Sequence, residues 1–281
     1  MHARKVGLGA NTQFGLKIEE QIKLFKRTGF EAFFTAWDNK IKKYKEISDN
    51  LNMLYQSVHA PTLRSADMWK NDQSAQDAVD ELISCVRDCG EAEIPIVVVH
   101  PYSGFDEEYI PNQYGVENFC KVVEEAGKWN IKIAFENLEG EEYLNCLMDA
   151  FSDYENVGFC WDSGHELCYN KGKDMLKLYG NRLIATHLND NLGVSDRDGN
   201  IFYTDDLHLL PFDGINNWEN IAKRLNKCNF NDTLTFELKI VSQPGRHEND
   251  KYASMPIEEY IAECYARARR VENMVRNNLG D

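Results

Sequence analysis

The sequence alternates short apolar segments with longer amphipathic ones, and this alternation limits the choice of fold more than any other feature. Each of eight segments of strand length precedes a segment with helical spacing of apolar residues. Eight such units in roughly 250 residues are typical of an α/β protein of the (β/α)8 TIM barrel class. The expected strands are Val6–Ala10, Glu31–Thr35, Gln56–His59, Pro95–His100, Ile131–Glu136, Val157–Asp162, Leu183–His187 and Leu234–Glu237.

The segments between these strands predict the helices. The apolar positions from Ile41 to Leu54 recur at helical spacing, whereas 96–99 reads Ile-Val-Val-Val and is apolar on both faces. The second pattern suits a parallel strand that is buried on both sides. The expected helices are Lys17–Thr28, Ile41–Leu54, Ser74–Ala92, Asn112–Trp129, Glu142–Phe151, Asp174–Tyr179, Trp218–Lys227 and Ile257–Val275.

A doubly wound open sheet is the competing fold. That fold usually carries a GxGxxG turn after its first strand, and here the first strand continues into Gly9-Ala10-Asn11-Thr12. No internal repeat, low-complexity tract or Pro- or Ser-rich linker divides the chain. We therefore expect a single barrel domain over residues 1–281.

Composition excludes several classes of function. The chain has 46 acidic and 31 basic residues, a net charge of −15, which disfavours broad nucleic-acid binding. No apolar run approaches the roughly 18 residues that a membrane helix needs, and no secretion signal is evident. The eight cysteines form no CxxC pair, and we expect them to be free thiols in a cytoplasmic protein.

Six consecutive expected strands end in a side chain that can bind metal or transfer protons. These residues are His59, His100, Glu136, Asp162, His187 and Glu237. In a barrel such positions converge on one mouth, where barrel active sites lie. His165, Asp206 and His208 follow in the adjoining loops, so five of the seven histidines belong to this set.

A bound divalent cation is the simplest reason for such a set, because crowded carboxylates and imidazoles repel or need burial without partners. Glu136, Asp162, His187 and Glu237 supply three carboxylates and one imidazole. That mixture suits Mn²⁺, Co²⁺ or Mg²⁺, and it also accepts Zn²⁺. If His59, His100, His165, Asp206 and His208 ligate too, the site becomes a polynuclear zinc site.

Four motifs carry a resemblance to a known family. They are Ser57-Val58-His59-Ala60-Pro61, Trp161-Asp162-Ser163-Gly164-His165, His187-Leu188-Asn189-Asp190, and Asp206-Leu207-His208-Leu209-Leu210-Pro211 with Gly214 and Trp218 beyond it. Over nearly its whole length the sequence resembles the xylose-isomerase-like TIM barrel superfamily. That superfamily holds sugar phosphate isomerases and epimerases together with AP endonuclease family 2, the endonuclease IV type.

The resemblance implies roles for these residues in either branch. In the epimerase branch the metal ligands correspond to Glu136, Asp162, His187 and Glu237, and His165 corresponds to a substrate-contacting histidine. In the endonuclease branch all nine zinc-ligand positions have counterparts. Ligand identity therefore does not separate the branches. The nine positions are His59, His100, Glu136, Asp162, His165, His187, Asp206, His208 and Glu237.

The expected function is a metal-dependent isomerase or epimerase of a sugar or sugar phosphate, working by proton transfer through a metal-stabilised enediolate. Glu136 and Glu237 are the expected catalytic residues, from strands on opposite sides of the barrel. Phe14 and Trp37 could cover the apolar face of the sugar. Lys239 or Arg246 could bind a phosphate group.

Three alternatives stay open at this point. They are an endonuclease IV-like zinc phosphodiesterase at abasic DNA sites, a sugar lyase similar to inosose dehydratase, and a catalytically silent carbohydrate-binding protein. The expected partner is a small-molecule sugar, with no membrane, and barrels of this kind often form homodimers.

Overall fold

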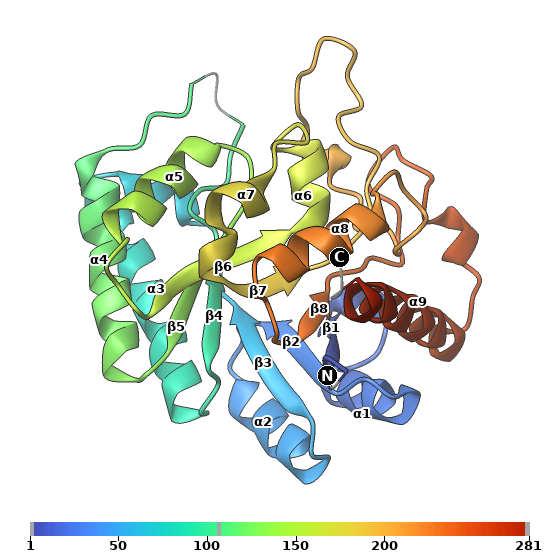
Figure 1. Cartoon of the computed structure of the whole chain (residues 1–281). Coiled ribbons are helices and arrows are strands. Elements are labelled where there is room, and N and C mark those ends of the chain that lie inside the picture. Colours follow the sequence, from blue (N-terminus) through green and yellow to red (C-terminus); the bar gives the residue numbers. More distant parts are fainter. Residues whose placement is uncertain (1–2, 106–107, 279–281) are drawn as a thin grey trace.

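The structure, a computed structural model, describes residues 3–105 and 108–278. Eight parallel strands surround a common axis and helices cover their outer side (Figure 1). The strands are β1 (Val6–Ala10), β2 (Ala32–Ala36), β3 (Leu54–His59), β4 (Ile96–Val99), β5 (Lys132–Glu136), β6 (Val157–Asp162), β7 (Leu183–His187) and β8 (Leu234–Phe236).

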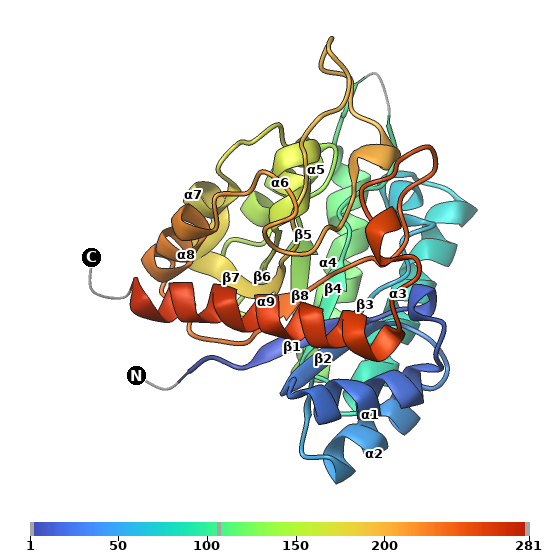
Figure 2. The same cartoon turned by 90° about the vertical axis from the view of Figure 1, so that its right-hand side faces the viewer.

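One helix or more follows each strand, apart from short 3-10 turns. The helices are α1 (Ile18–Thr28), α2 (Ile41–Asn50), α3 (Gln73–Glu91), α4 (Gln113–Lys128), α5 (Glu141–Ala150), α6 (Ser163–Cys168), α7 (Met175–Tyr179), α8 (Trp218–Lys227) and α9 (Ile257–Asn277). The last helix, α9, lies across the outside of β1 and β8, so the two ends of the described chain lie near each other (Figure 2). Within the described ranges, no helix is long and apolar enough to cross a membrane.

The strands follow each other round the barrel in chain order, β1 to β7, and β8 pairs with β1. The ring is completed between β7 and β8 by two backbone hydrogen bonds. Leu188 N–H donates to the carbonyl of Thr235 over 2.9 Å, and Glu237 N–H donates to the carbonyl of Leu188 over 3.2 Å. The expected (β/α)8 TIM barrel is therefore confirmed.

Two helix predictions need correction. The helix expected over Ile41–Leu54 ends at Asn50, because Asn52 takes a left-handed conformation with φ of 48° and Leu54 already begins β3. The apolar residues after the helix belong to the turn and to β3, so the apolar pattern predicted a helix that is too long. The short helix α6 was not expected at all, since only six residues form it and they include Ser163 and Gly164.

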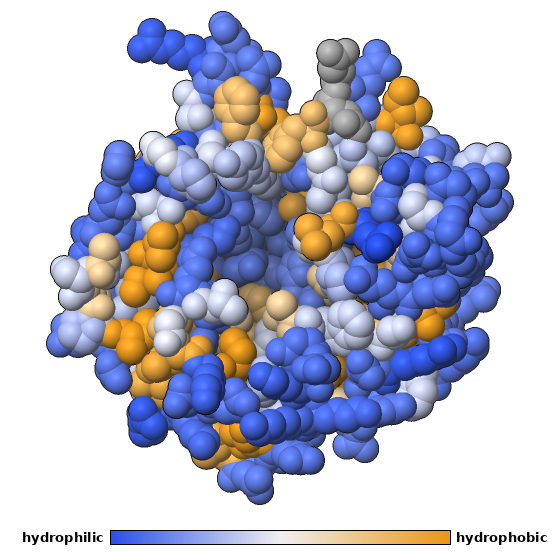
Figure 3. Space-filling model, turned by 180° about the vertical axis from the view of Figure 1, so that it is seen from behind, coloured by the Kyte–Doolittle hydropathy of each residue, from blue (hydrophilic) through white to orange (hydrophobic). Residues whose placement is uncertain are grey.

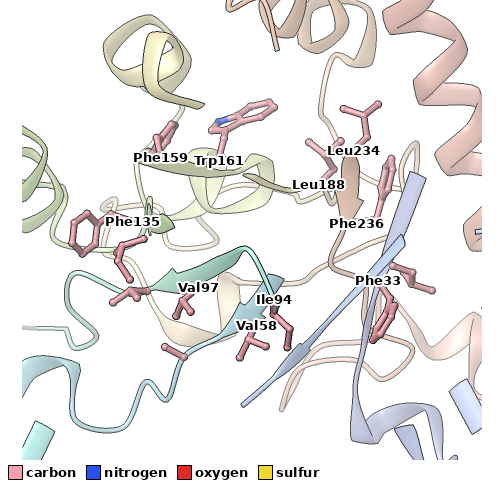
Figure 4. Packing of buried hydrophobic residues seen from close by; sticks show 14 of the residues in the cluster. Phe33, Val58, Ile94, Val97, Phe135, Phe159, Trp161, Leu188, Leu234 and Phe236 are labelled. Carbon is pink, nitrogen blue, oxygen red and sulfur yellow. The ribbon is translucent and has the colours of Figure 1, made fainter. Parts of the chain in front are cut away.

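Alternate residues of each strand face opposite sides of the barrel wall, as the period of two requires. Val97 of β4 and Phe135 of β5 point outward into the layer beneath the helices (Figure 4). Val98, Ala134, Cys160 and Ala185 instead form a small inner cluster with Ile96. Cys160 is one of eight cysteines, all of them free as expected. The strand residue two places after an inner residue also faces inward, and at the end of β5 that residue is Glu136.

The interior near β1 is open only because β1 carries glycines there. A Cβ at Gly9 would lie 2.5 Å from the Cζ atom of Phe34. Phe34 in turn stacks on the imidazole of His187, with ring centroids 4.5 Å apart and planes 16° apart. Gly9 thus makes room for a ring that fixes the plane of His187.

We expect Gly9→Ala to destabilise the barrel, because the added methyl group displaces Phe34 within a packed interior. Overpacking of this kind lowers the free energy of unfolding by about 1–3 kcal/mol. Urea unfolding followed by circular dichroism measures it. Gly127→Ala on α4 is the control, since the nearest atom to its Cβ is 3.6 Å away. Equal stability of the two variants would contradict this account.

Candidate metal centre

The last side chains of the strands face the interior, so they come together at the carboxyl end of the barrel. His59, Glu136, Asp162 and His187 are the last residues of β3, β5, β6 and β7. His100 and Glu237 follow one residue after β4 and β8. Together with His165, Asp206 and His208, all of these residues except His100 fall into three groups, each able to offer ligand atoms within 4.8 Å of one another. His100 adjoins His59, with the two Nε2 atoms 3.0 Å apart.

The first group contains Glu136, Asp162, His187 and Glu237. His187 Nδ1 lies 3.0 Å from Glu136 Oε1 and 3.1 Å from Glu237 Oε2. Glu136, Asp162 and His187 are fully buried, whereas the side chain of Glu237 is 28% exposed. Only Glu237 of this group therefore also lines the open cavity.

The second group contains His59, Glu136 and His187, and His100 adjoins it, so that two imidazoles lie against the other oxygen of Glu136. The Nε2 atoms of His59 and His100 lie 3.0 Å apart, and they lie 3.4 Å and 3.5 Å from Glu136 Oε2. Each Nδ1 has its own acceptor, the carbonyl of Ala60 for His59 and the hydroxyl of Ser103 for His100. If both Nδ1 atoms carry the proton, the two Nε2 lone pairs face each other, and a cation between them removes this repulsion.

The third group lies beside the first. His165 Nε2 is 3.4 Å from Asp206 Oδ1, and His208 Nε2 is 2.6 Å from Asp206 Oδ2. Both histidines direct Nδ1 away, toward the carbonyl oxygens of Asn137 and Glu237. Ligands bound at about 2.0–2.1 Å in a tetrahedral zinc site lie about 3.3 Å from each other, close to most of these separations.

Buried atoms without partners show that the site fits cations. Within the described part of the chain, Glu136 Oε2 and Asp206 Oδ1 are buried and have no hydrogen-bond partner. Buried carboxylate oxygens without a partner are costly, and a metal ion would satisfy them. The donor set of nitrogen and oxygen atoms is that of a divalent cation site.

The electrostatics of the groups point the same way. Burial would raise the pKa of Glu136, but the imidazoles of His187, His100 and His59 hold it well below its usual range. Burial lowers the pKa of His100 to about 4, so that imidazole is neutral at physiological pH and can ligate. Burial opposes the charged form of His187 too, but the neighbouring Cys160, Glu136 and Glu237 raise its pKa well above the usual value.

A shell of asparagines and one ion pair holds the ligand candidates in place. Asp162 Oδ1 accepts from the backbone N–H groups of Gly164 and His165 at 2.7 Å, and thus caps α6. Its Oδ2 accepts from Asn189 Nδ2 at 2.8 Å. Asn137 binds both backbone polar groups of Asp162, with N–O distances of 2.8 and 2.9 Å. Such outer contacts orient metal ligands.

Helix α6, which carries His165, is fixed from outside the barrel. Glu166 accepts two hydrogen bonds of 2.7 Å from the guanidinium of Arg224 in α8 and one of 3.0 Å from Trp161 Nε1. Two parallel hydrogen bonds between guanidinium and carboxylate define orientation as well as distance.

A cavity of about 490 Å³ opens above these groups of candidate ligands. Figure 3 shows a hollow in the molecular surface, with hydrophilic residues in its interior. Trp37 lines this cavity, and its Nε1 donates to Asp88 Oδ2 over 3.0 Å. Phe34, Glu139, Tyr169 and Tyr203 line it too.

The structure places Phe14 in the core, not in the mouth. The 3-10 turn Thr12–Phe14 after β1 directs its ring against Phe25 of α1 and Tyr260 of α9, and the residue is 4% exposed. The suggestion that Phe14 covers a substrate therefore has no geometric basis. Glu136 and Glu237 are also closer than expected, because β5 and β8 are only three strands apart round the ring.

Sequence reasoning did not identify several cavity residues. Phe34 could have been found from the alternation of side chains along β2, which directs it into the barrel interior. Asn137 and Asn189 hold Asp162 without lining the cavity, and they could have been found as polar residues one and two positions after the strand-end residues Glu136 and His187. Glu139 is a buried carboxyl whose pKa is raised by burial, and its Oε1 accepts from Gly104 N–H over 2.9 Å. No local pattern distinguishes Glu139 from a surface glutamate.

Sequence comparison identifies relatives of two kinds. The chain is 29% identical over 243 residues to the uncharacterized protein y4fM of Sinorhizobium fredii, covering 79% of this chain and 75% of that protein. It is 25% identical over 210 residues to a probable endonuclease 4 of Mycoplasma mycoides, covering 65% and 71%.

Solved structures share the fold. L-ribulose 3-epimerase superposes with a TM-score of 0.73 at 12% identity, covering 98% of this chain and 96% of that one. The IolI protein with a binding zinc atom superposes with a TM-score of 0.72 at 16% identity, covering 98% of this chain and 99% of that one. A fusion of a xylose isomerase-like TIM barrel with 4-hydroxyphenylpyruvate dioxygenase gives 0.75 at 14%, and this chain spans 99% of its own length but 44% of the fusion.

The family profile described as xylose isomerase-like TIM barrel matches residues 22–259, which hold all nine ligand candidates. The chain belongs to the xylose isomerase-like TIM barrel family.

Proposed function

We propose that the protein is a metal-dependent isomerase or epimerase of an uncharged sugar. The observation that supports this proposal most is the set of side chains that line the mouth cavity. Carboxylates and imidazoles line it, and no lysine or arginine of the described chain does. A phosphate group requires cationic or N–H donors, whereas the hydroxyl and carbonyl oxygens of a neutral sugar suit a cation at the cavity floor.

The two basic residues that could serve a phosphorylated sugar already have acidic partners. Lys239 Nζ lies 3.2 Å from Asp206 Oδ2. Arg246 lies 3.2 Å from Asp205 and 2.8 Å from Glu248. These contacts neutralise both cations, which supports a substrate without phosphate.

Glu136, Asp162, His187 and Glu237 would hold the principal cation. Such an ion supplies Lewis acidity, polarising a sugar carbonyl and stabilising the negative charge of an enediolate. The groups with two imidazoles favour Zn²⁺, while the oxygen-rich group also accepts Mn²⁺, Co²⁺ or Mg²⁺.

Glu237 is the better placed of the two glutamates to move a proton. Both oxygens of Glu136 face imidazoles, Oε1 toward His187 and Oε2 toward His59 and His100. Glu237 directs Oε2 to His187, and its Oε1 has no hydrogen-bond partner among the described residues. Because Glu237 also lines the cavity, this oxygen could accept a proton from a carbon next to the carbonyl.

Hydrolysis of a phosphodiester at abasic DNA sites is the second candidate. It is favoured by the second and third ligand groups, which a single-metal isomerase does not need, and by the endonuclease 4 relatives. Clusters of metal ions a few ångströms apart are typical of phosphoester cleavage. The absence of basic residues from the cavity lining in the described chain counts against it.

We expect the purified protein to bind divalent metal, and Glu136→Gln to weaken that binding. Glu136 faces two groups at once, so its loss is expected to lower zinc affinity at least about tenfold. Competition with a chromogenic chelator measures it. Glu124→Gln on the exposed face of α4 is the control. Unchanged zinc affinity of Glu136→Gln would contradict the assignment.

We expect exchange of substrate hydrogen with solvent deuterium by the metal-loaded protein, tested with ketohexoses and ketopentoses by NMR. Glu237→Gln should slow this exchange by about 10²- to 10⁴-fold, the usual contribution of general acid–base catalysis. Zinc content is measured in parallel, so that loss of metal is separated from loss of the base. Exchange that survives in Glu237→Gln would refute its role.

We expect no cleavage of a duplex oligonucleotide that carries one abasic site. Three bound metal ions per chain together with nicking of that duplex would replace the isomerase proposal with the second candidate. An undamaged duplex of the same sequence is the control for contaminating nucleases.

A further inference from the structure

A second cavity of about 850 Å³ adjoins the mouth cavity. The two cavities share three residues, Phe105, Tyr169 and Tyr203. We call the second one the annex, and it is lined by loops that follow β4, β5, β6 and β7. The loops after β4 and β7 project from the same end of the barrel in Figure 1 and lie close together in Figure 2, and residues of both line the annex. The annex is therefore an extension of the candidate active site.

The annex is lined by aromatic rings that remain exposed. Phe105, Phe202 and Tyr203 are 44%, 47% and 58% exposed. Figure 3 shows apolar residues at the upper rim of the hollow. Exposed apolar patches of this kind mark ligand grooves or interaction sites. Because the patch continues into the mouth, a ligand bound there is the economical explanation.

A row of rings connects the annex to the metal-binding groups. Tyr169 lies against His165, with ring centroids 5.0 Å apart, and against Phe105, at 5.8 Å. Tyr169 is 9% exposed, and its hydroxyl has no hydrogen-bond partner among the described residues. A group that leads from the mouth into the annex would pass this hydroxyl.

Two lysines and two glutamates line the annex, so their charges balance. Lys173 pairs with Glu141, and Lys171 and Glu142 bring one further charge of each sign. The annex therefore has no excess of positive or negative charge that would attract a strongly charged ligand group. Rings with an apolar face and hydroxyls at the edge suit such a lining, because aromatic side chains stack on that face.

Resting on the proposed function, we propose that the substrate is a glycoside. Because the glycosidic bond leaves no free aldehyde, its first sugar ring must carry a keto group, and this group lies at the cation in the mouth. A second ring stacks on Phe105, Phe202 and Tyr203 in the annex. The two cavities together exceed what one sugar ring needs, since pockets of about 300–1,000 Å³ bury drug-sized ligands. The second ring is a sugar or an aromatic aglycone, which offer the same stacking face.

The test is direct binding to the zinc-loaded protein by isothermal titration calorimetry. The probes are the methyl and phenyl glycosides of glucose, galactose and mannose, with disaccharides of the same sugars. The glycosides lack the keto group, so they bind without reacting. We expect phenyl glycosides or disaccharides to bind about three- to tenfold more tightly than the methyl glycosides, the effect of one aromatic stack. Preference for phenyl glycosides identifies an aromatic aglycone, and preference for disaccharides identifies a sugar.

Phe202→Ala should remove this preference and leave the affinity of the methyl glycosides unchanged. Leu192→Ala is the matched control, since Leu192 is 40% exposed in the same loop and lines neither cavity. Equal affinity of paired methyl and phenyl glycosides and disaccharides, or no binding of any two-ring probe at millimolar concentration, would overturn the inference.

Failure of the isomerase proposal looks different. Two-ring probes would then still bind with the Phe202 dependence, while no hydrogen exchange with solvent occurs. Conversely, exchange with free monosaccharides and no gain from a second ring would retain the proposed function and remove the annex from it.

Discussion

The burial of one carboxylate among imidazoles is the constraint on which the rest of the site depends. Glu136 is fully buried and turns one oxygen to His187 and the other to His59 and His100. A lone buried carboxylate would be costly, so it needs positive charge on both sides. His100 is neutral, so protons on His187 and His59, whose pKa values are raised beside Glu136, supply that charge in the free protein, and cations would supply it in a loaded one. Each neighbouring group is therefore positioned with respect to this residue.

The barrel and the site are two consequences of one periodicity. Each strand alternates between the outer apolar layer and the interior, and next to Val98, Ala134, Cys160 and Ala185 the interior is narrow. Larger inward side chains fit only where the strands end and the interior opens. His59, Glu136, Asp162 and His187 occupy those positions. The fold thus confines polar chemistry to one end.

Strand order, strand count and the nine ligand candidates followed from the sequence, because runs such as 96–99 and 157–162 carry strong apolar patterns that end in a polar residue. Other features did not follow. The end of α2 depends on the conformation of Asn52, which no apolar pattern encodes. The core position of Phe14 depends on the turn Thr12–Phe14 and on α9, more than 240 residues away. Glu139 acquires its environment from Gly104, on another loop.

The candidate ligands lie at strand ends, whereas the exposed rings of the annex lie in loops, and this difference has an evolutionary consequence. The ligand candidates on the strands are tied to backbone hydrogen bonds of the barrel, whereas the exposed rings of the annex, Phe105, Phe202 and Tyr203, belong to loops after β4 and β7. Replacement of Phe105, Phe202 or Tyr203 would therefore change the annex while the ligand candidates at the strand ends stay as they are. Homologous barrels with different partners in the mouth would be expected to diverge first in these two loops.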